Sequence, residues 1–101
     1  MAHRVVFAPE AEADLLALYD YVAGDGSEER ALDYVERIEG ACLSLANFPE
    51  RGTRRDDVRP GLRVIGFERR VAIAFHVTVA AVTIDRILYG GRDLGTAFDE
   101  S

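Results

Sequence analysis

Few side chains in this sequence are of the types that carry out catalysis. The 101 residues hold two histidines, His3 and His76, and one cysteine, Cys42. General acid–base chemistry needs a positioned acid and base, and covalent chemistry needs a nucleophile beside a base. His3 lies next to the N-terminus, and His76 ends an apolar stretch, where a structural role is expected. The sequence therefore offers no nucleophile–base pair and predicts no catalytic residue.

The cysteine and the carboxylates indicate no other reactive centre. Cys42 falls on the apolar positions of a helical pattern, where we expect a buried and unreactive thiol. Asp56 and Asp57 adjoin in a polar stretch and are interpreted as solvated. The spacing of histidine, cysteine and carboxylate side chains matches no metal-ligand motif. The sequence therefore predicts no metal site and no cofactor.

Arginine supplies every one of the 12 cationic side chains, and the net charge is −6. Residues 1–50 hold eleven acids and three arginines, whereas residues 51–101 hold nine arginines and seven acids. A protein that grips nucleic acid through its phosphates usually has a larger cationic surplus. Two interpretations stay open for five arginines: their guanidinium groups cluster on one face of a sheet, or each is solvated or paired. These residues are Arg59, Arg63, Arg70, Arg86 and Arg92.

Two helices are expected to position the first half of these side chains. Apolar residues recur at helical spacing from residue 11 to 22, after Pro9 and before a Gly-Asp-Gly sequence at 24–26. Ser27 is a suitable N-cap for a second helix, whose apolar stripe runs through Cys42 to a stop at residues 48–49. The short connection between them predicts an antiparallel helical hairpin.

Three leucines do not fit the apolar stripes of these helices. Leu16 lies about 120° from the centre of its stripe, and Leu32 and Leu43 lie about 80–100° from theirs, at about 100° per residue. A single exposed leucine is ordinary. Together, Leu16, Leu32 and Leu43 predict a surface for a partner helix or for a second subunit.

Strands are expected before and after the hairpin. Residues 4–7 form a short strand pattern, and residues 62–67, 70–77 and 81–89 are rich in Val, Ile and Phe with short connections, which predicts an antiparallel meander. Strict alternation would place Arg86 on the same side as Ile84 and Leu88, as a buried structural cation paired with an acid such as Asp93.

The whole chain is expected to form one α+β domain. The predicted order is an N-terminal strand, an antiparallel helical hairpin and a three-stranded antiparallel meander, with the helices packed on one face of the sheet. Residues 49–61 read as a loop. Residues 1–101 suffice for a single domain, and we expect short flexible ends at 1–3 and 96–101.

The sequence predicts a cytoplasmic protein that does not enter a membrane. A single cysteine rules out a disulfide framework within the chain. A secretion signal requires an apolar stretch after the N-terminus, and this sequence shows none at that position. The longest apolar run, residues 71–75, is far shorter than a membrane span.

Four segments in this order resemble the RelE/ParE superfamily of type II toxins, and its ParE branch in particular. They are Phe7-Ala8-Pro9-Glu10 with the helix that follows, residues 31–45 followed by Phe48-Pro49-Glu50 and Gly52, Arg59-Pro60-Gly61-Leu62-Arg63, and Ile87-Leu88-Tyr89-Gly90-Gly91-Arg92-Asp93. The resemblance extends from Val5 to about Leu94. Two positions depart from the superfamily pattern: Tyr89 stands where a histidine is frequent, and Phe75-His76 stands where a tyrosine is frequent.

The resemblance implies a toxin that acts by binding and not by catalysis. It implies a cognate antitoxin that wraps around the chain in a hetero-oligomer, DNA gyrase as the target, and no sequence-specific contact with nucleic acid. It places target contacts on the sheet and after the last strand, here at Arg59, Arg63, Arg70, Arg86 and Arg92; the antitoxin would cover Leu16, Leu32 and Leu43. Two alternatives stay open: a ribosome-dependent mRNA endonuclease of the RelE type, and a non-toxic relative that only binds an antitoxin.

Overall fold

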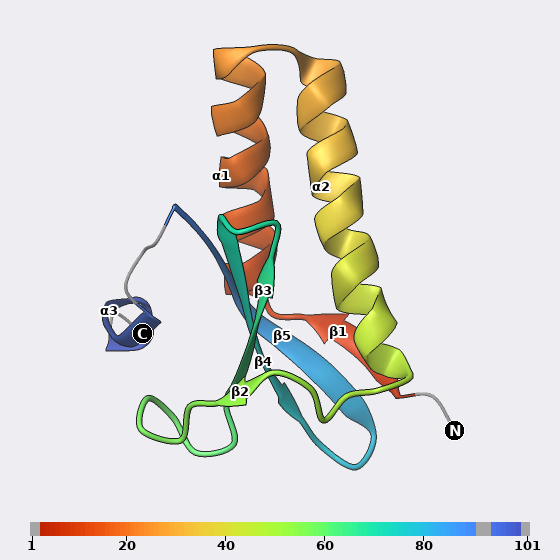
Figure 1. Ribbon diagram of the computed structural model, residues 1–101, viewed down its shortest axis with the longest axis vertical. Helices are drawn as coiled ribbons and strands as arrows, with labels where there is room; N and C mark the ends of the chain where they lie inside the picture. The colour runs from red at the N-terminus through yellow and green to blue at the C-terminus, as the bar shows by residue number, and fades with distance from the viewer. Residues whose placement is uncertain (1–2, 91–93, 100–101) are drawn as a thin grey trace.

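The computed structural model describes residues 3–90 and 94–99 and confirms the α+β class (Figure 1). A helical hairpin lies on one side of a five-stranded sheet. Two short elements, β2 and α3, and a 3₁₀ turn, η1, add to the predicted order. The elements are β1 (Arg4–Phe7), α1 (Pro9–Asp25), α2 (Glu28–Leu43), η1 (Ser44–Ala46), β2 (Thr53–Arg54), β3 (Arg63–Phe67), β4 (Val71–Val77), β5 (Ala81–Tyr89) and α3 (Leu94–Asp99).

The two long helices begin where local signals predict. Pro9 occupies the first position of α1, and acidic residues fill its first turn. Ser27 caps α2, because its hydroxyl oxygen accepts a hydrogen bond from the backbone N–H of Arg30 at 3.1 Å. α2 ends at Leu43, but η1 continues the helical path, so the stretch as a whole stops close to the predicted residue 48. In Figure 1 the upper half of the hairpin extends beyond the sheet.

The strands form one mixed sheet in the order β1-β5-β4-β3-β2. β3, β4 and β5 make the predicted antiparallel meander. β1 pairs in parallel with the first half of β5, from Arg4 opposite Ala81 to Phe7 opposite Ile84. β2 lies inside the stretch that the sequence analysis assigned to a loop, and it pairs with only two residues of β3. Such a short pairing carries no readable period, which is why the pattern did not predict it.

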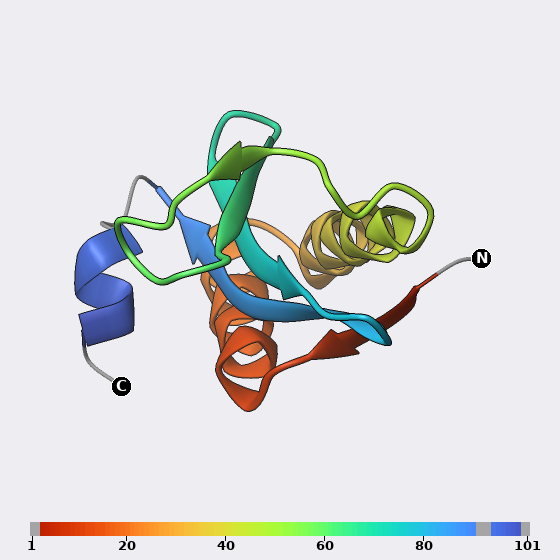
Figure 2. The same ribbon diagram turned by 90° about the horizontal axis from the view of Figure 1, so that it is seen from below.

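The main core lies between the sheet and the helical hairpin. It consists of both predicted helical stripes together with the side chains of β4 and β5 that face them. Figure 2, in which the helices are viewed end-on, shows α1 and α2 together on one side of the sheet. The side chains that form it are all apolar and include Leu15, Leu18, Ile38, Cys42, Leu45, Val71, Ile73, Phe75, Val82, Ile84 and Ile87.

A β-bulge in β5 changes which side chains face this core. Ala74 lies opposite Arg86, and the next residue, Phe75, lies opposite Ile84, so Asp85 has no partner residue in β4. Ile84 and Ile87 both belong to the main core although they are three residues apart. The expectation that Arg86 shares a side with Ile84 is therefore wrong, because the bulge interrupts the alternation on which it depended.

The C-terminal helix α3 lies beside the loop between β2 and β3, away from the hairpin (Figures 1 and 2). Leu62, Leu88 and Ala97 are buried but do not belong to the main core. The expectation of a flexible end from residue 96 onward is wrong for residues 96–99, because they belong to α3. Among the described residues, no helix has the length and apolar character needed to cross a membrane.

Candidate functional site

The three leucines that do not fit the helical stripes are exposed, as predicted. The exposed fractions are 68% for Leu16, 52% for Leu32 and 55% for Leu43. Leu16 borders a hollow of about 380 Å³ between α1 and α2, whose rim carries Glu12 and Glu39. Leu32 and Leu43 lie three to four residues from α2 side chains that line this hollow, which makes them its neighbours on the helix surface. We call these three residues the leucine surface.

The arginines that the sequence analysis grouped do not form one cluster. Arg59 lies in the loop before β3, with its guanidinium 4.4 Å from the centre of the Phe98 ring. Arg63 begins β3 and lies 3.9 Å from a carboxylate oxygen of Glu50. Arg70 is exposed beside the turn between β3 and β4. Arg92 lies outside the described residues.

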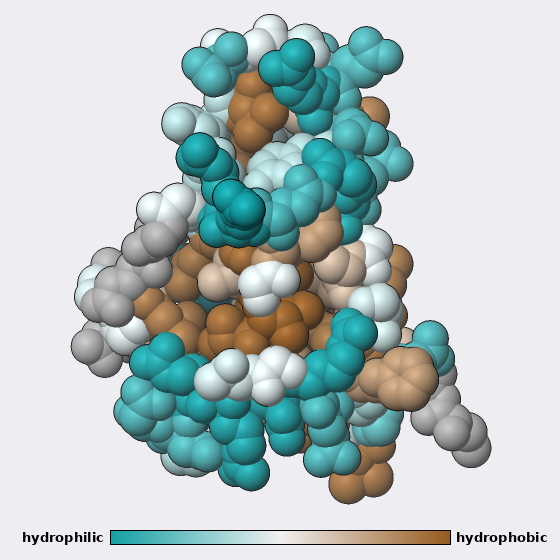
Figure 3. Space-filling model, viewed as in Figure 1, coloured by the Kyte–Doolittle hydropathy of each residue, from teal (hydrophilic) through white to brown (hydrophobic). Residues whose placement is uncertain are grey.

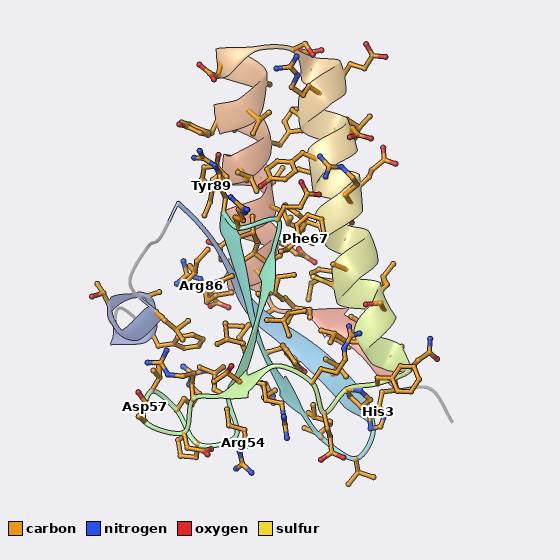
Figure 4. The ribbon with its side chains drawn as sticks, viewed as in Figure 1. His3, Arg54, Asp57, Phe67, Arg86 and Tyr89 are labelled. Carbon is orange, nitrogen blue, oxygen red and sulfur yellow. The ribbon has the colours of Figure 1, made fainter. Side chains whose placement is uncertain are left out.

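Arg86 is held by the most extensive polar contacts of the group. Its Nε and Nη2 donate to the two carboxylate oxygens of Asp14 in α1 at 2.8 and 3.0 Å, and its Nη1 donates to the backbone oxygen of Ala97 in α3 at 3.0 Å. Both side chains of the pair are mostly buried, with 14% of Arg86 and 8% of Asp14 exposed. Figure 4 shows Arg86 between the sheet and α3.

Asp14 also completes the hydrogen bonding of β5. Its Oδ2 accepts the backbone N–H of Ile87 at 2.8 Å, at the edge of β5 that β1 leaves unpaired after Ile84. A single carboxylate thus neutralises a buried cation and satisfies a strand N–H. The expected partner of Arg86, Asp93, lies outside the described residues, and among those residues the carboxylate that pairs with Arg86 is that of Asp14.

His76 is paired with the bulged residue of the neighbouring strand. Its Nδ1 lies 2.7 Å from Oδ2 of Asp85, whose side chain is 9% exposed, while 37% of the His76 side chain is exposed. Asp85 and Arg86 also line a small hollow of about 120 Å³ together with Glu10, Arg59 and Phe98. The structure therefore brings Arg59 and Arg86 together, in a neighbourhood where acidic side chains balance their charge.

Cys42 is buried, as predicted. None of its surface is exposed, and burial raises the pKa of its thiol to about 12, with a smaller contribution from the charge of Glu39. A thiol with this pKa carries almost no thiolate at neutral pH. Within residues 3–90 and 94–99, histidine, cysteine and carboxylate side chains nowhere gather in a way that could hold a metal ion.

Sequence reasoning missed Asp14 and Asp85, although each left a signal. Asp14 lies three residues after Ala11 and four before Leu18, both of which are buried, so a charged side chain borders the apolar stripe of α1. Asp85 and Arg86 interrupt the apolar pattern of residues 81–89 with two adjacent charges, a departure from alternation that is typical of a bulge. Neither signal identifies the partner, which is 72 residues away in sequence for Asp14 and 9 residues away for Asp85.

The comparisons with known proteins agree with this architecture. The family described as "ParE toxin of type II toxin-antitoxin system, parDE" matches residues 5–94. A solved structure titled "Chromosomal ParDE TA system from P. aeruginosa" is similar, with 28% sequence identity and a TM-score of 0.77, over 88% of this chain and 97% of that one. A comparison with curated protein sequences gives no match.

Proposed function

Because this chain belongs to the ParE toxin family of type II toxin–antitoxin systems, we propose that it inhibits DNA gyrase by binding and is neutralised by a cognate antitoxin in the cytoplasm. The family match over residues 5–94 is the observation that carries this proposal. The described site supports binding over catalysis, because Cys42 is buried and protonated and the charged side chains are largely paired with one another.

A gyrase assay tests the target directly. Purified toxin should inhibit DNA supercoiling by gyrase, and addition of the antitoxin should restore it. Growth arrest on induced expression without any loss of supercoiling activity would show a toxin with another target. Absence of both effects would indicate the non-toxic, antitoxin-binding relative.

The proposed target contacts are Arg59, Arg63, Arg70, Arg86 and Arg92. The structure ranks them by accessibility: Arg59 and Arg70 are exposed, whereas Arg86 is committed to Asp14. Arg92→Glu should abolish growth arrest while the melting temperature and antitoxin binding stay unchanged. A folded Arg92→Glu variant with full toxicity would remove the C-terminal segment from the proposed contact surface.

We propose that the leucine surface binds the antitoxin. An amphipathic helix could place its apolar face against Leu16, Leu32 and Leu43 and over the hollow between the helices. Leu32→Glu with Leu43→Glu should weaken antitoxin binding by roughly a hundredfold, the scale of two lost interface anchors.

The matched control for this variant is Val79→Glu. Val79 is a fully exposed apolar side chain in the turn between β4 and β5, far along the chain from the hairpin. This change also replaces an exposed apolar side chain with glutamate, adding one negative charge instead of two, without touching the leucine surface. Isothermal calorimetry should show full affinity for the control, and equal affinity of all three proteins would refute the site.

An mRNA endonuclease of the RelE type is the second candidate, and the His76–Asp85 pair is the observation that favours it. A buried carboxylate that orients a partly exposed imidazole is an arrangement suited to proton transfer. We expect no cleavage of messenger RNA on translating ribosomes. Codon-positioned cuts that disappear in His76→Ala would establish this second function instead.

A further inference from the structure

Three tyrosine rings meet where β5 ends against the helical hairpin. The Tyr89 ring lies 5.6 Å from that of Tyr21 in α1 and 6.4 Å from that of Tyr34 in α2, measured between ring centres. Arg37 of α2 places its guanidinium 5.2 Å from the centre of the Tyr34 ring. Tyr21 remains 62% exposed despite its contact with Tyr89. Large, partly exposed rings are thus gathered from three separate elements; Figure 4 labels Tyr89 near the end of β5.

The turn between β3 and β4 adds arginines to this group. Glu68 and Arg69 both have positive φ, at 48° and 69°, a conformation in which glycine and asparagine are usual. Glu68 forms an ion pair with Arg37, which accounts for a side chain at that position. No hydrogen bond or ion pair holds the side chain of Arg69 or Arg70 within residues 3–90 and 94–99. Arg69 therefore keeps an unfavourable backbone conformation, and no hydrogen bond or ion pair among the described residues accounts for its side chain.

Arg70 belongs to the same neighbourhood as the tyrosines. Its backbone oxygen accepts a hydrogen bond from the N–H of Gly90, directly after Tyr89, at 2.8 Å. Burial and the proximity of Tyr89 raise the pKa of Tyr34, while the positive charges of Arg37 and Arg70 act against that rise. Figure 3 shows hydrophilic side chains over this part of the molecule, above the apolar side chains of the sheet.

We propose that this region binds an acidic segment of the protein that the toxin targets. The proposed contacts, which we call the tyrosine–arginine surface, are Tyr21, Tyr34, Arg37, Arg69, Arg70 and Tyr89. Tyrosine and arginine are the side chains that most often dominate binding energy at protein interfaces. Exposed guanidinium groups bind carboxylates in a bidentate manner, while the rings offer apolar area at low entropic cost. The inference rests on the proposed function, since it takes the partner to be the toxin's target.

The geometry favours a protein partner over nucleic acid. Bases stack on ring faces that are open to solvent. Here the rings are turned against one another, at 56° for Tyr21–Tyr89 and 79° for Tyr34–Tyr89, and Arg37 lies over Tyr34. A nucleic acid carries a phosphate at every nucleotide, and these would also meet the surrounding helices, which belong to the half of the chain that holds eleven acids and three arginines. A peptide needs only a few carboxylates opposite Arg69 and Arg70.

Arg69→Gly separates a binding role from a structural one. Glycine adopts positive φ without steric cost, so this variant should melt at the same temperature as the wild type or above it. If Arg69 binds the target, the same variant should nevertheless lose growth arrest. Arg4→Ala is the matched control, because it removes an exposed arginine from β1 at the opposite edge of the sheet. Full toxicity of Arg69→Gly combined with Arg70→Glu would overturn the proposal.

A direct titration makes the test independent of toxicity. A synthetic peptide of glutamate and aspartate interspersed with leucine should shift the NMR signals of Tyr21, Tyr34 and Tyr89. Arg69→Gly with Arg70→Glu should weaken that binding about tenfold, as expected for the loss of one or two charge contacts. No shift at millimolar peptide, or tighter binding of a single-stranded oligonucleotide, would refute the acidic-peptide assignment. Absence of growth arrest in the wild type would count against the proposed function alone.

Discussion

The main core and the ion pairs of Asp85 and Arg86 share strand β5 but are held together by different forces. The core side of β5 buries apolar residues such as Val82 and Ile84 against two helices, and any side chain of suitable size and shape could fill it. Arg86 instead depends on two named oxygens of Asp14 and on the carbonyl of Ala97. The first region tolerates repacking, whereas the second fails if any one partner is absent.

The bulge at Asp85 makes this division possible. It allows Ile84 and Ile87 to face the helices while Asp85 pairs with His76 and Arg86 reaches Asp14. Within the described residues, every buried side-chain nitrogen or oxygen has a hydrogen-bonding partner. Buried polar atoms must have hydrogen-bonding partners. The main core meets this requirement by excluding polar side chains, and the region around Asp85 and Arg86 meets it by pairing them.

The largest expected effect comes from emptying the centre of the main core. Phe75 is the largest side chain with no exposed surface, and Phe75→Ala should lower the free energy of unfolding by about 4 kcal/mol. Phe75→Leu, which keeps most of the volume, should cost far less. Urea denaturation measures both. Equal costs for the two variants would show that the core also depends on specific geometry.

Breaking the buried ion pair should be nearly as costly. Arg86→Ala leaves the carboxylate of Asp14 buried without its cation and should lower the free energy of unfolding by about 3 kcal/mol. Arg54→Ala is the matched control, because Arg54 forms a solvent-exposed pair with Asp56 and its removal should leave the stability nearly unchanged. Thermal melts compare the two. Full stability of Arg86→Ala would move that residue to the surface contacts.

The smallest effect is expected at Cys42, a small apolar side chain within the main core. Cys42→Ala should lower the free energy of unfolding by about 1 kcal/mol and leave activity intact. The native thiol should react with a maleimide only as fast as the protein opens, because the site is buried and the thiol pKa is about 12. Rapid labelling of folded protein would contradict this packing.

The main core was predictable because periodicity reports burial directly. Leu15, Leu18, Ile38 and Cys42 lie at helical spacing, and their burial follows from that spacing without knowledge of any partner. The capping of α2 by Ser27 was predictable for the same reason, since a cap is a local interaction. The parallel pairing of β1 with β5 was not predictable, because neither short segment carries a pattern that identifies the strand beside it.

The candidate sites were harder to predict because they depend on contacts between distant residues. The sequence suggested that five arginines could form one cluster. It could not show that Arg86 is paired while Arg70 is exposed. Within the tyrosine–arginine surface, Tyr21, Tyr34 and Tyr89 come together only in the folded chain. The exposure of the three leucines was predictable, because departure from a helical stripe is a local signal, whereas antitoxin binding at the leucine surface stays a prediction.

The pairing of β1 with β5 also bears on how the toxin is made. β5 is the strand that connects β1 to β4, and it is the last of the five to be synthesised. Until residue 81 has emerged, β1 and α1 have no sheet to join, and contacts this distant in sequence form slowly. A nascent chain that stops before β5 therefore has neither a closed core nor a folded structure.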